Sequence, residues 1–116
     1  MDYSFEKADN VVVLNVSGNV LTGIHNGEIL NEVTNKISED QNKMVIHLGG
    51  TKYINSNGLN LLLNVLTKCR KAGGEVVLAN VPDELSRLLI MTKLNSIFIT
   101  RDSQQEAVEY LKNLDN

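Results

Sequence analysis

One short segment of the chain combines a hydroxyl side chain with a setting that favours an anion. The segment 53–59, YINSNGL, follows the apolar run Met44 to Leu48 and leads into a leucine-rich run that ends at Leu66. This order places Ser56 where a strand ends and a helix begins. The first N–H groups of a helix lack internal partners and its dipole is positive at that end, so a phosphate carried by Ser56 would be stabilised there. Ser56 is therefore a candidate phosphoacceptor.

Local sequence alone favours a simpler interpretation of the same residue. A serine at a helix start is most often an N-cap, which is worth about 1 kcal/mol. Asn57-Gly58 and Asn26-Gly27 are turn-forming pairs and predict local chain reversal. A serine nucleophile would need a base and an orienting acid, and nothing in the sequence argues positively for such a triad. The chain is not expected to be an enzyme.

The other residues with reactive side chains do not form a recognisable site. His25 lies in an expected loop and has no assigned role, whereas His47 ends an apolar strand and is interpreted as a structural histidine. Cys69 is the only cysteine, so neither an internal disulfide nor a thiolate metal cluster is expected. The sequence has no glycine-rich phosphate loop of the Walker or dinucleotide type. We therefore expect no metal, cofactor or catalytic residues.

Composition describes an ordinary globular chain. Its 116 residues fit one domain, 1–116, with 42% hydrophobic and 22% charged residues. The net charge of −3 argues against nucleic acid as a partner. No run approaches the ~20 apolar residues that cross a bilayer, and the N-terminus lacks a signal-peptide pattern, so a cytoplasmic protein without membrane contact is expected. The basic residues Lys68, Arg70 and Lys71 are interpreted as favourable charges at a helix C-terminus.

Hydrophobic periodicity predicts an α/β fold. Alternating and β-branched runs predict strands at 3–5, 11–16, 43–48, 75–79 and 97–99, and Gly49-Gly50 either ends the third strand or admits another backbone. Helical spacing predicts a first helix over 26–38 with Asn26 as its N-cap, and a second from Leu59 to a stop at Gly73-Gly74. A third helix is predicted from Pro82, as its first residue, through Leu89. A fourth is predicted from a capping box at 103–106 to Leu114. The order of elements predicts a mostly parallel five-stranded sheet with an N-terminal strand pair, flanked by about four helices.

The segment 48–59, together with the element order, resembles the STAS domain of bacterial anti-sigma factor antagonists. The family form of the segment is an aromatic or apolar pair followed by Asp-Ser-Ser/Thr-Gly-Leu, and here it is Tyr53-Ile54-Asn55-Ser56-Asn57-Gly58-Leu59. The stretches 16–18, 73–79 and 88–94 also resemble the family, so the likeness covers nearly the whole chain. The resemblance implies a single STAS domain.

The resemblance also implies a function in transcription regulation. An unmodified antagonist of this family binds an anti-sigma factor, often a serine kinase, and phosphorylation of the first serine of the motif releases it until a phosphatase restores it. That serine is Ser56 here, and the residues implied to contact the partner are Asn55, Ser56, Asn57 and Gly58. A phosphate adds about −1.5 to −2 charges at neutral pH, enough to disrupt a docking surface that does not pair it.

Three positions depart from the family pattern, and they keep two alternatives open. Asn55 replaces the family Asp, Asn57 replaces the second hydroxyl residue, and Leu21 occupies the position of an Asp that usually follows the first glycine. One alternative is a STAS interaction or scaffold module that is not phosphorylated. The other is a small-ligand or nucleotide sensor that binds at the strand ends. The sequence predicts neither the oligomeric state nor the identity of the anti-sigma factor.

Overall fold

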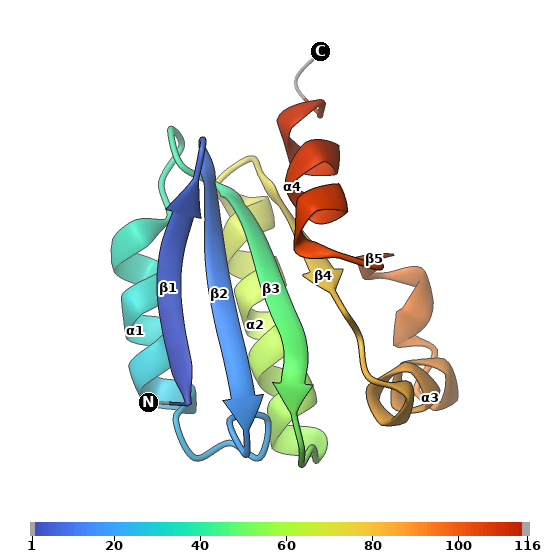
Figure 1. Ribbon diagram of the computed structural model, residues 1–116. Helices are drawn as coiled ribbons and strands as arrows, with labels where there is room; N and C mark the ends of the chain where they lie inside the picture. The colour runs from blue at the N-terminus through green and yellow to red at the C-terminus, as the bar shows by residue number, and fades with distance from the viewer. Residues whose placement is uncertain (1, 115–116) are drawn as a thin grey trace.

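The computed structural model describes residues 2–114 and contains one five-stranded sheet in the order β1-β2-β3-β4-β5 (Figure 1). The strands are β1 (Tyr3–Ala8), β2 (Val11–Gly18), β3 (Lys43–Thr51), β4 (Glu75–Ala79) and β5 (Ile99–Arg101). β1 pairs antiparallel with β2, and the other neighbours pair in parallel. Within the described residues the helices are α1 (Asn26–Lys36), α2 (Ser56–Lys71), α3 (Asp83–Met91), the short 3₁₀ turn η1 (Leu94–Ser96) and α4 (Gln104–Lys112). The predicted fold class is confirmed.

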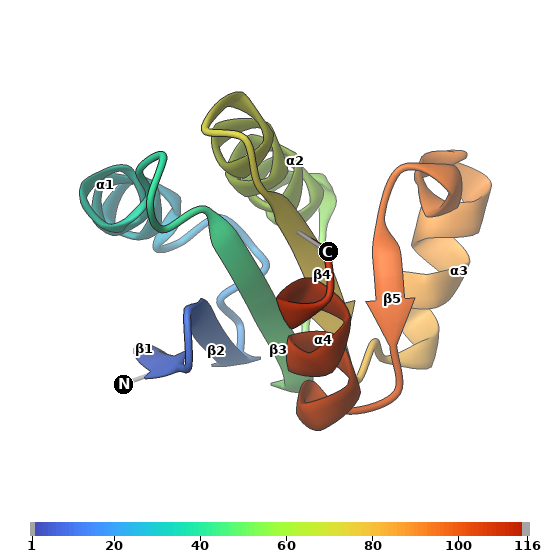
Figure 2. The ribbon, with the colours of Figure 1, turned by 90° about the horizontal axis from the view of Figure 1, so that it is seen from above.

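Helices cover the two faces of the sheet unequally. Viewed from above, α1 and α2 lie on one face, α4 lies on the opposite face, and α3 lies beside β5 (Figure 2). Alternation along the strands explains this division, because successive side chains of a strand point to opposite faces. Val12, Leu14 and Val16 of β2 belong to the core shared with α1, α2 and α3, whereas Val11 and Val13 belong to the core under α4.

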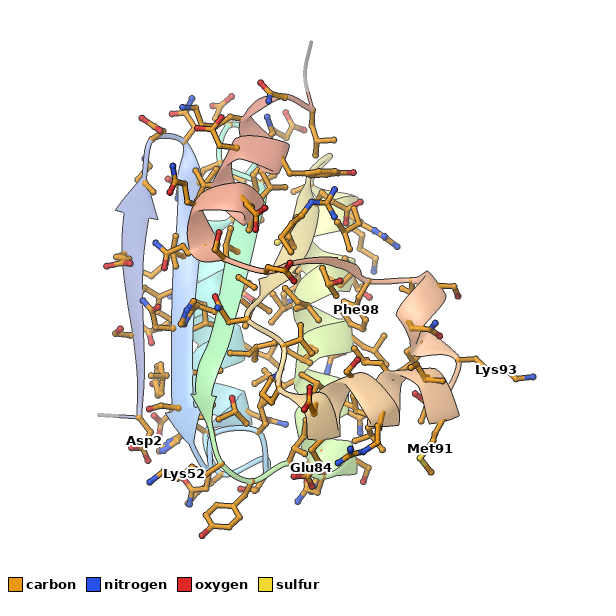
Figure 3. The ribbon with its side chains drawn as sticks, turned by 45° about the vertical axis from the view of Figure 1, so that its right-hand side comes forward. Asp2, Lys52, Glu84, Met91, Lys93 and Phe98 are labelled. Carbon is orange, nitrogen blue, oxygen red and sulfur yellow. The ribbon has the colours of Figure 1, made fainter. Side chains whose placement is uncertain are left out.

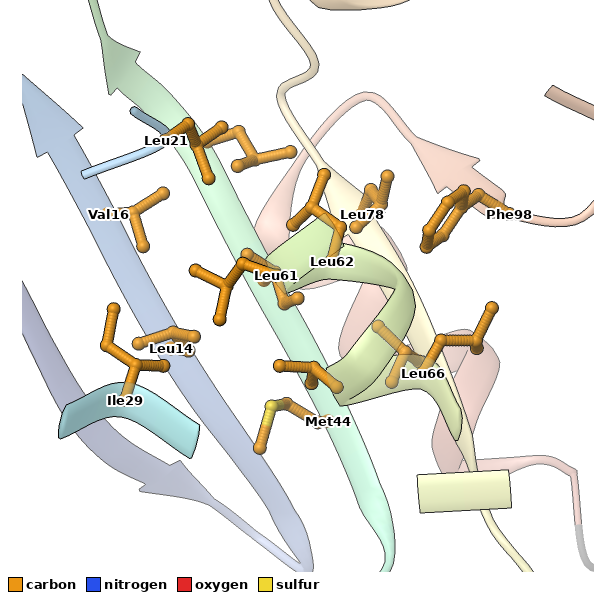
Figure 4. Packing of buried hydrophobic residues seen from close by; sticks show 14 of the residues in the cluster. Leu14, Val16, Leu21, Ile29, Met44, Leu61, Leu62, Leu66, Leu78 and Phe98 are labelled. Carbon is orange, nitrogen blue, oxygen red and sulfur yellow. The ribbon is translucent and has the colours of Figure 1, made fainter. Parts of the chain in front are cut away.

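The larger core is built around α2. Its buried face carries Leu59, Leu61, Leu62, Val65, Leu66 and Cys69, whereas Leu63, which helical spacing also places on this face, is only partly buried. Figure 4 shows Leu61, Leu62 and Leu66 packed between Leu14 and Met44 on one side and Leu78 and Phe98 on the other. Full burial of a side chain of this size contributes about 1.5–3 kcal/mol. The leucine-rich run therefore attaches α2, and with it Ser56, to the centre of the sheet.

The C-terminal end of α2 closes as predicted. Gly73 has a φ of 93°, which suits glycine, and its N–H donates to the Arg70 carbonyl (3.0 Å). Among the basic residues near this end, Arg70 pairs with the carboxylate of Glu75 (Nε to Oε1, 3.0 Å) and donates to the Ile97 carbonyl (3.1 Å). The basic side chain thus ties the helix end to β4 and to the segment before β5.

Two helices begin one residue away from the predicted position. The prediction that Asn26 caps α1 is wrong: His25 is the N-cap without a side-chain hydrogen bond, and Asn26 lies in the first turn. The Asn26 amide instead donates to the Asn57 carbonyl (3.0 Å), a tertiary bond that local sequence does not reveal. Pro82 is the N-cap of α3, and α3 begins at Asp83, because the ψ of Pro82 is extended (152°).

The third strand continues through its glycine pair. β3 does not end at Leu48 but runs to Thr51, and Gly50 pairs with Ser17 of β2. A Cβ atom on Gly50 would lie 2.8 Å from the Ser17 Cβ, closer than such atoms approach. Close approach of the neighbouring strand, rather than a strand break, therefore explains this pair.

Other strand and helix ends also differ from the predicted positions. The last strand is β5 at 99–101 instead of 97–99, because Phe98 turns into the larger core and the Asn80 N–H donates to the Arg101 carbonyl (3.1 Å). α1 stops at Lys36 rather than Ser38. α4 ends at Lys112, so the prediction that this helix runs to Leu114 and packs that side chain is wrong: Leu114 lies beyond the helix and is 42% exposed.

The predicted capping box of α4 forms in part. The Ser103 hydroxyl accepts a hydrogen bond from the Glu106 N–H (3.1 Å), as expected for an N-cap. The Glu106 carboxylate accepts from that same hydroxyl (3.3 Å) instead of reaching the Ser103 amide. The cap therefore stabilises the start of α4, which covers the smaller core.

The buried thiol of Cys69 gives a direct test of core packing. Burial, with a smaller contribution from Glu75, raises the pKa of Cys69 to about 12, so the thiol stays protonated at pH 8. We expect iodoacetamide at pH 8 to leave the native protein unmodified and to alkylate it fully in urea, as measured by intact mass. Rapid alkylation of the native protein would contradict this packing.

Candidate functional site

Ser56 is the first residue of α2 and is exposed. Asn55, not Ser56, is the N-cap: its Oδ1 accepts hydrogen bonds from the N–H groups of Asn57 (2.9 Å) and Gly58 (3.2 Å). The interpretation of Ser56 as the N-cap is therefore wrong, and the amide at position 55 does what the missing family Asp would do. The Ser56 hydroxyl has no hydrogen bond within residues 2–114, and it stands free at the positive end of a sixteen-residue helix.

The loop between β2 and α1 is bound to this helix start. The Asn55 backbone N–H donates to the Leu21 carbonyl (3.1 Å), and its side-chain amide donates to the Thr22 carbonyl (3.2 Å). The N–H groups of Lys52 and Tyr53 both donate to the Gly18 carbonyl (2.9 and 3.2 Å). These bonds join loop 19–25 and segment 52–58 into one surface at the carboxyl ends of β2 and β3.

Two glycines permit this close contact. A Cβ atom on Gly58 would overlap the carbonyl oxygen of Leu21, so no other residue fits there without moving the loop. Gly23 has a φ of 96°, and a Cβ atom on it would lie 2.7 Å from the Asn57 Cβ. Asn57-Gly58 thus lies in the first helical turn rather than in a chain reversal, and its glycine serves packing.

A polar cluster holds the other end of loop 19–25. The Tyr3 hydroxyl of β1 donates to the Glu28 carboxylate (2.9 Å), and the His25 Nδ1 lies 3.5 Å from the same carboxylate oxygen. Burial, followed by the hydrogen bond to Glu28, raises the pKa of Tyr3 to about 12. The phenol therefore remains a donor throughout the physiological range. His25, to which the sequence assigns no role, is the last residue of this loop and the N-cap of α1.

The predicted site residues lie together at the start of α2. Within residues 2–114, neither histidine forms a metal site with them. Asn55, Ser56 and Asn57 are exposed, whereas Gly58 is buried against Leu21. The first turn of α2 contains no acidic residue, so Ser56 has no carboxylate beside it in that turn. Within residues 2–114, no group of three or more His, Cys, Asp or Glu side chains could hold a metal ion. In the same described part, no helix is long and apolar enough to cross a membrane.

The chain matches a known protein family over most of its length. The family model for the STAS domain matches residues 2–107. A curated relative from Bordetella bronchiseptica, named "Putative anti-sigma factor antagonist BtrV", is 24% identical over 97% of this chain and 96% of its own length.

Solved structures show the same fold. A protein from Thermotoga maritima, TM1081, described as a "putative anti-sigma factor antagonist", is similar with a TM-score of 0.79 and 22% identity over 96% of this chain and 95% of that chain. The Bacillus cell fate determinant SpoIIAA in its phosphorylated form is similar with a TM-score of 0.66 and 12% identity, covering 93% of this chain and 97% of its own. At these identities, the likeness to the solved structures establishes the fold.

Substitution of the two helix-start glycines tests the close contact. We expect Gly58→Ala to destabilise the protein by about 2–4 kcal/mol, because its Cβ would displace the Leu21 carbonyl. Gly27→Ala is the control: its Cβ meets no atom within 4 Å, and alanine in a helix is favoured by up to about 1 kcal/mol. Urea unfolding measures both, and equal effects would contradict the packing at Gly58.

Capping predicts a contrast between two adjacent residues. Asn55→Ala should cost about 1–2 kcal/mol, since it leaves two helix N–H groups without their acceptor. Ser56→Ala should change stability by less than about 0.5 kcal/mol, because the hydroxyl caps nothing. Thermal unfolding followed by circular dichroism gives both values. A larger loss for Ser56→Ala than for Asn55→Ala would reverse the assignment of the cap.

Proposed function

Because the chain belongs to the STAS domain family, we propose that it is an anti-sigma factor antagonist whose binding to a partner is switched by reversible phosphorylation of Ser56. The observation that carries the proposal is the exposed, unbonded hydroxyl of Ser56 at the start of α2. The family resemblance implies that this serine is the phosphoacceptor. The name of BtrV supports the class of function, and the phosphorylated form of SpoIIAA shows that a protein of this fold carries a phosphate. The role is regulatory and non-catalytic.

The proposed reaction takes place on the partner enzyme. An anti-sigma factor of the serine-kinase type transfers the γ-phosphoryl group of ATP to the Ser56 Oγ; ADP leaves, and the hydroxyl proton passes to a base of the kinase. A phosphatase later uses water to release inorganic phosphate and restore the hydroxyl. This chain supplies the acceptor and holds it in place through Asn55, which fixes the first turn of the helix.

Local electrostatics favour the phosphorylated state of the antagonist itself. Asn55 and Asn57 flank Ser56 without charge, and the first turn of α2 has no carboxylate to repel a phosphate. The helix dipole favours an anion at this end by about 0.3–1 kcal/mol at exposed sites. The phosphate thus raises the stability of the free antagonist or leaves it unchanged. At the same time it adds a dianion to the surface that contacts the partner.

Phosphate transfer is the first test of the proposal. Each kinase-type anti-sigma factor encoded in the same genome is incubated with the chain and ATP, and intact mass is measured. We expect one of them to add about 80 Da, one phosphoryl group, to the wild type and to Ser86→Ala, but not to Ser56→Ala. Ser86 is an exposed serine of α3 and serves as the control. Phosphate that persists in Ser56→Ala would refute the assignment of Ser56.

A matched pair of substitutions tests the switch. Ser56→Asp places a negative charge at the helix start and should weaken binding to the same anti-sigma factor by about tenfold or more. In Ser56→Asn the new side chain is nearly the same size as that of Asp but carries no charge, so this variant should bind within about threefold of wild type. Isothermal titration calorimetry supplies the dissociation constants. Wild-type affinity for Ser56→Asp would contradict release by charge.

A further inference from the structure

Two large apolar side chains are exposed on the two segments that meet at the start of α2. Ile24, in the loop between β2 and α1, is 62% exposed, and Tyr53, just before the helix start, is 64% exposed. Both side chains would lose apolar surface to water on contact with a partner. Ile24 and Tyr53 belong to loop 19–25 and segment 52–58, which contact each other, whereas the other exposed large apolar residues belong to α3, to the segment before β5 and to the residues after α4.

The two side chains are carried by one rigid surface. Ile24 lies between Gly23, which packs on Asn57, and Asn26, which donates to the Asn57 carbonyl (3.0 Å). The Tyr53 N–H donates to the Gly18 carbonyl at the start of the same loop (3.2 Å). Since the backbones that carry them are already ordered, a partner would not have to order either segment on binding, which favours affinity.

The centre of this surface carries no formal charge. Ile24, Tyr53, Asn55, Ser56 and Asn57 are all neutral, and the first turn of α2 has no acidic residue. Charged side chains lie around it: Figure 3 places Lys52 and Glu84 at the same end of the molecule. Protein interfaces characteristically have a centre that is depleted of charge and enriched in aromatic residues, with a polar rim.

Resting on the proposed function, we propose that Ile24 and Tyr53 form the apolar centre of the interface with the anti-sigma factor, which presents an uncharged, apolar patch to them. A few large side chains carry most of the binding energy at such interfaces, and Ser56 is too small to do so. The proposal also explains release: a phosphate on Ser56 places a dianion at a neutral centre, where binding would strip it of water without supplying a cation.

Single substitutions test the assignment. Using the anti-sigma factor that phosphorylates the wild type, calorimetry should show about tenfold or greater weakening for Ile24→Ser and for Tyr53→Ser. Leu114→Ser is the control, because Leu114 is also exposed (42%) but follows α4, and the C-terminal end of α4 lies opposite to the end at which α2 begins (Figure 1). It should bind within about twofold of wild type. Thermal unfolding should be unchanged in all three, as the replaced side chains are exposed.

The outcomes separate this inference from the proposed function. If the wild type binds no kinase-type anti-sigma factor, the proposed function fails. If the wild type binds and both Ile24→Ser and Tyr53→Ser bind equally well, the function stands and the apolar centre is refuted. Gel filtration of the chain alone distinguishes a second copy as occupant: a dimer that Tyr53→Ser converts to a monomer would overturn the assignment to the anti-sigma factor.

Discussion

The contact between the first turn of α2 and the Leu21 carbonyl is the constraint on which the rest of the functional end depends. Gly58 lies directly against this carbonyl, and Asn55 donates its own N–H to the same oxygen (3.1 Å). Any side chain at position 58 would separate the two segments. Because they stay together, loop 19–25 and the helix start form one surface, and Ser56 is displayed on it with its hydroxyl free.

The unequal division of the two cores explains why this surface lies where it does. α2 is buried deeply by the larger core, so its N-terminus is fixed relative to the carboxyl ends of the parallel strands (Figure 4). In parallel sheets the loops that follow the strands gather at one edge, where binding sites usually form. Here the loops after β2 and β3 meet at that edge. The smaller core under α4 contributes stability to the opposite face and takes no part in the proposed site.

The exchange of the family Asp for an amide at position 55 has a consistent physical meaning. Asn55 accepts the same two N–H groups that a capping Asp would accept, so the helix start is preserved without a charge. Phosphorylation of Ser56 would then add nearly two negative charges beside side chains that carry none. The departures from the family pattern therefore suit the proposed switch.

Strong local patterns were sufficient for most of the architecture. Alternating β-branched runs predicted the strands, and the leucine spacing from Leu59 to Cys69 predicted the most deeply buried helix, since both periodicities follow directly from element geometry. Element ends were less predictable. Asn26 and Pro82 each have a residue type that suits more than one position at a helix start, and a tertiary hydrogen bond or the ψ angle decided between them.

The sequence by itself determined the fold class, the family likeness and the place of Ser56 at a helix start, because these depend on residue types and spacing along the chain. Only the tertiary structure decided that Gly58 lies against the Leu21 carbonyl and that the loop carrying Ile24 contacts the segment carrying Tyr53. Each of these facts depends on contact between segments some thirty residues apart. Local propensity carries no information about such contacts, which are established only when the sheet brings the ends of β2 and β3 together.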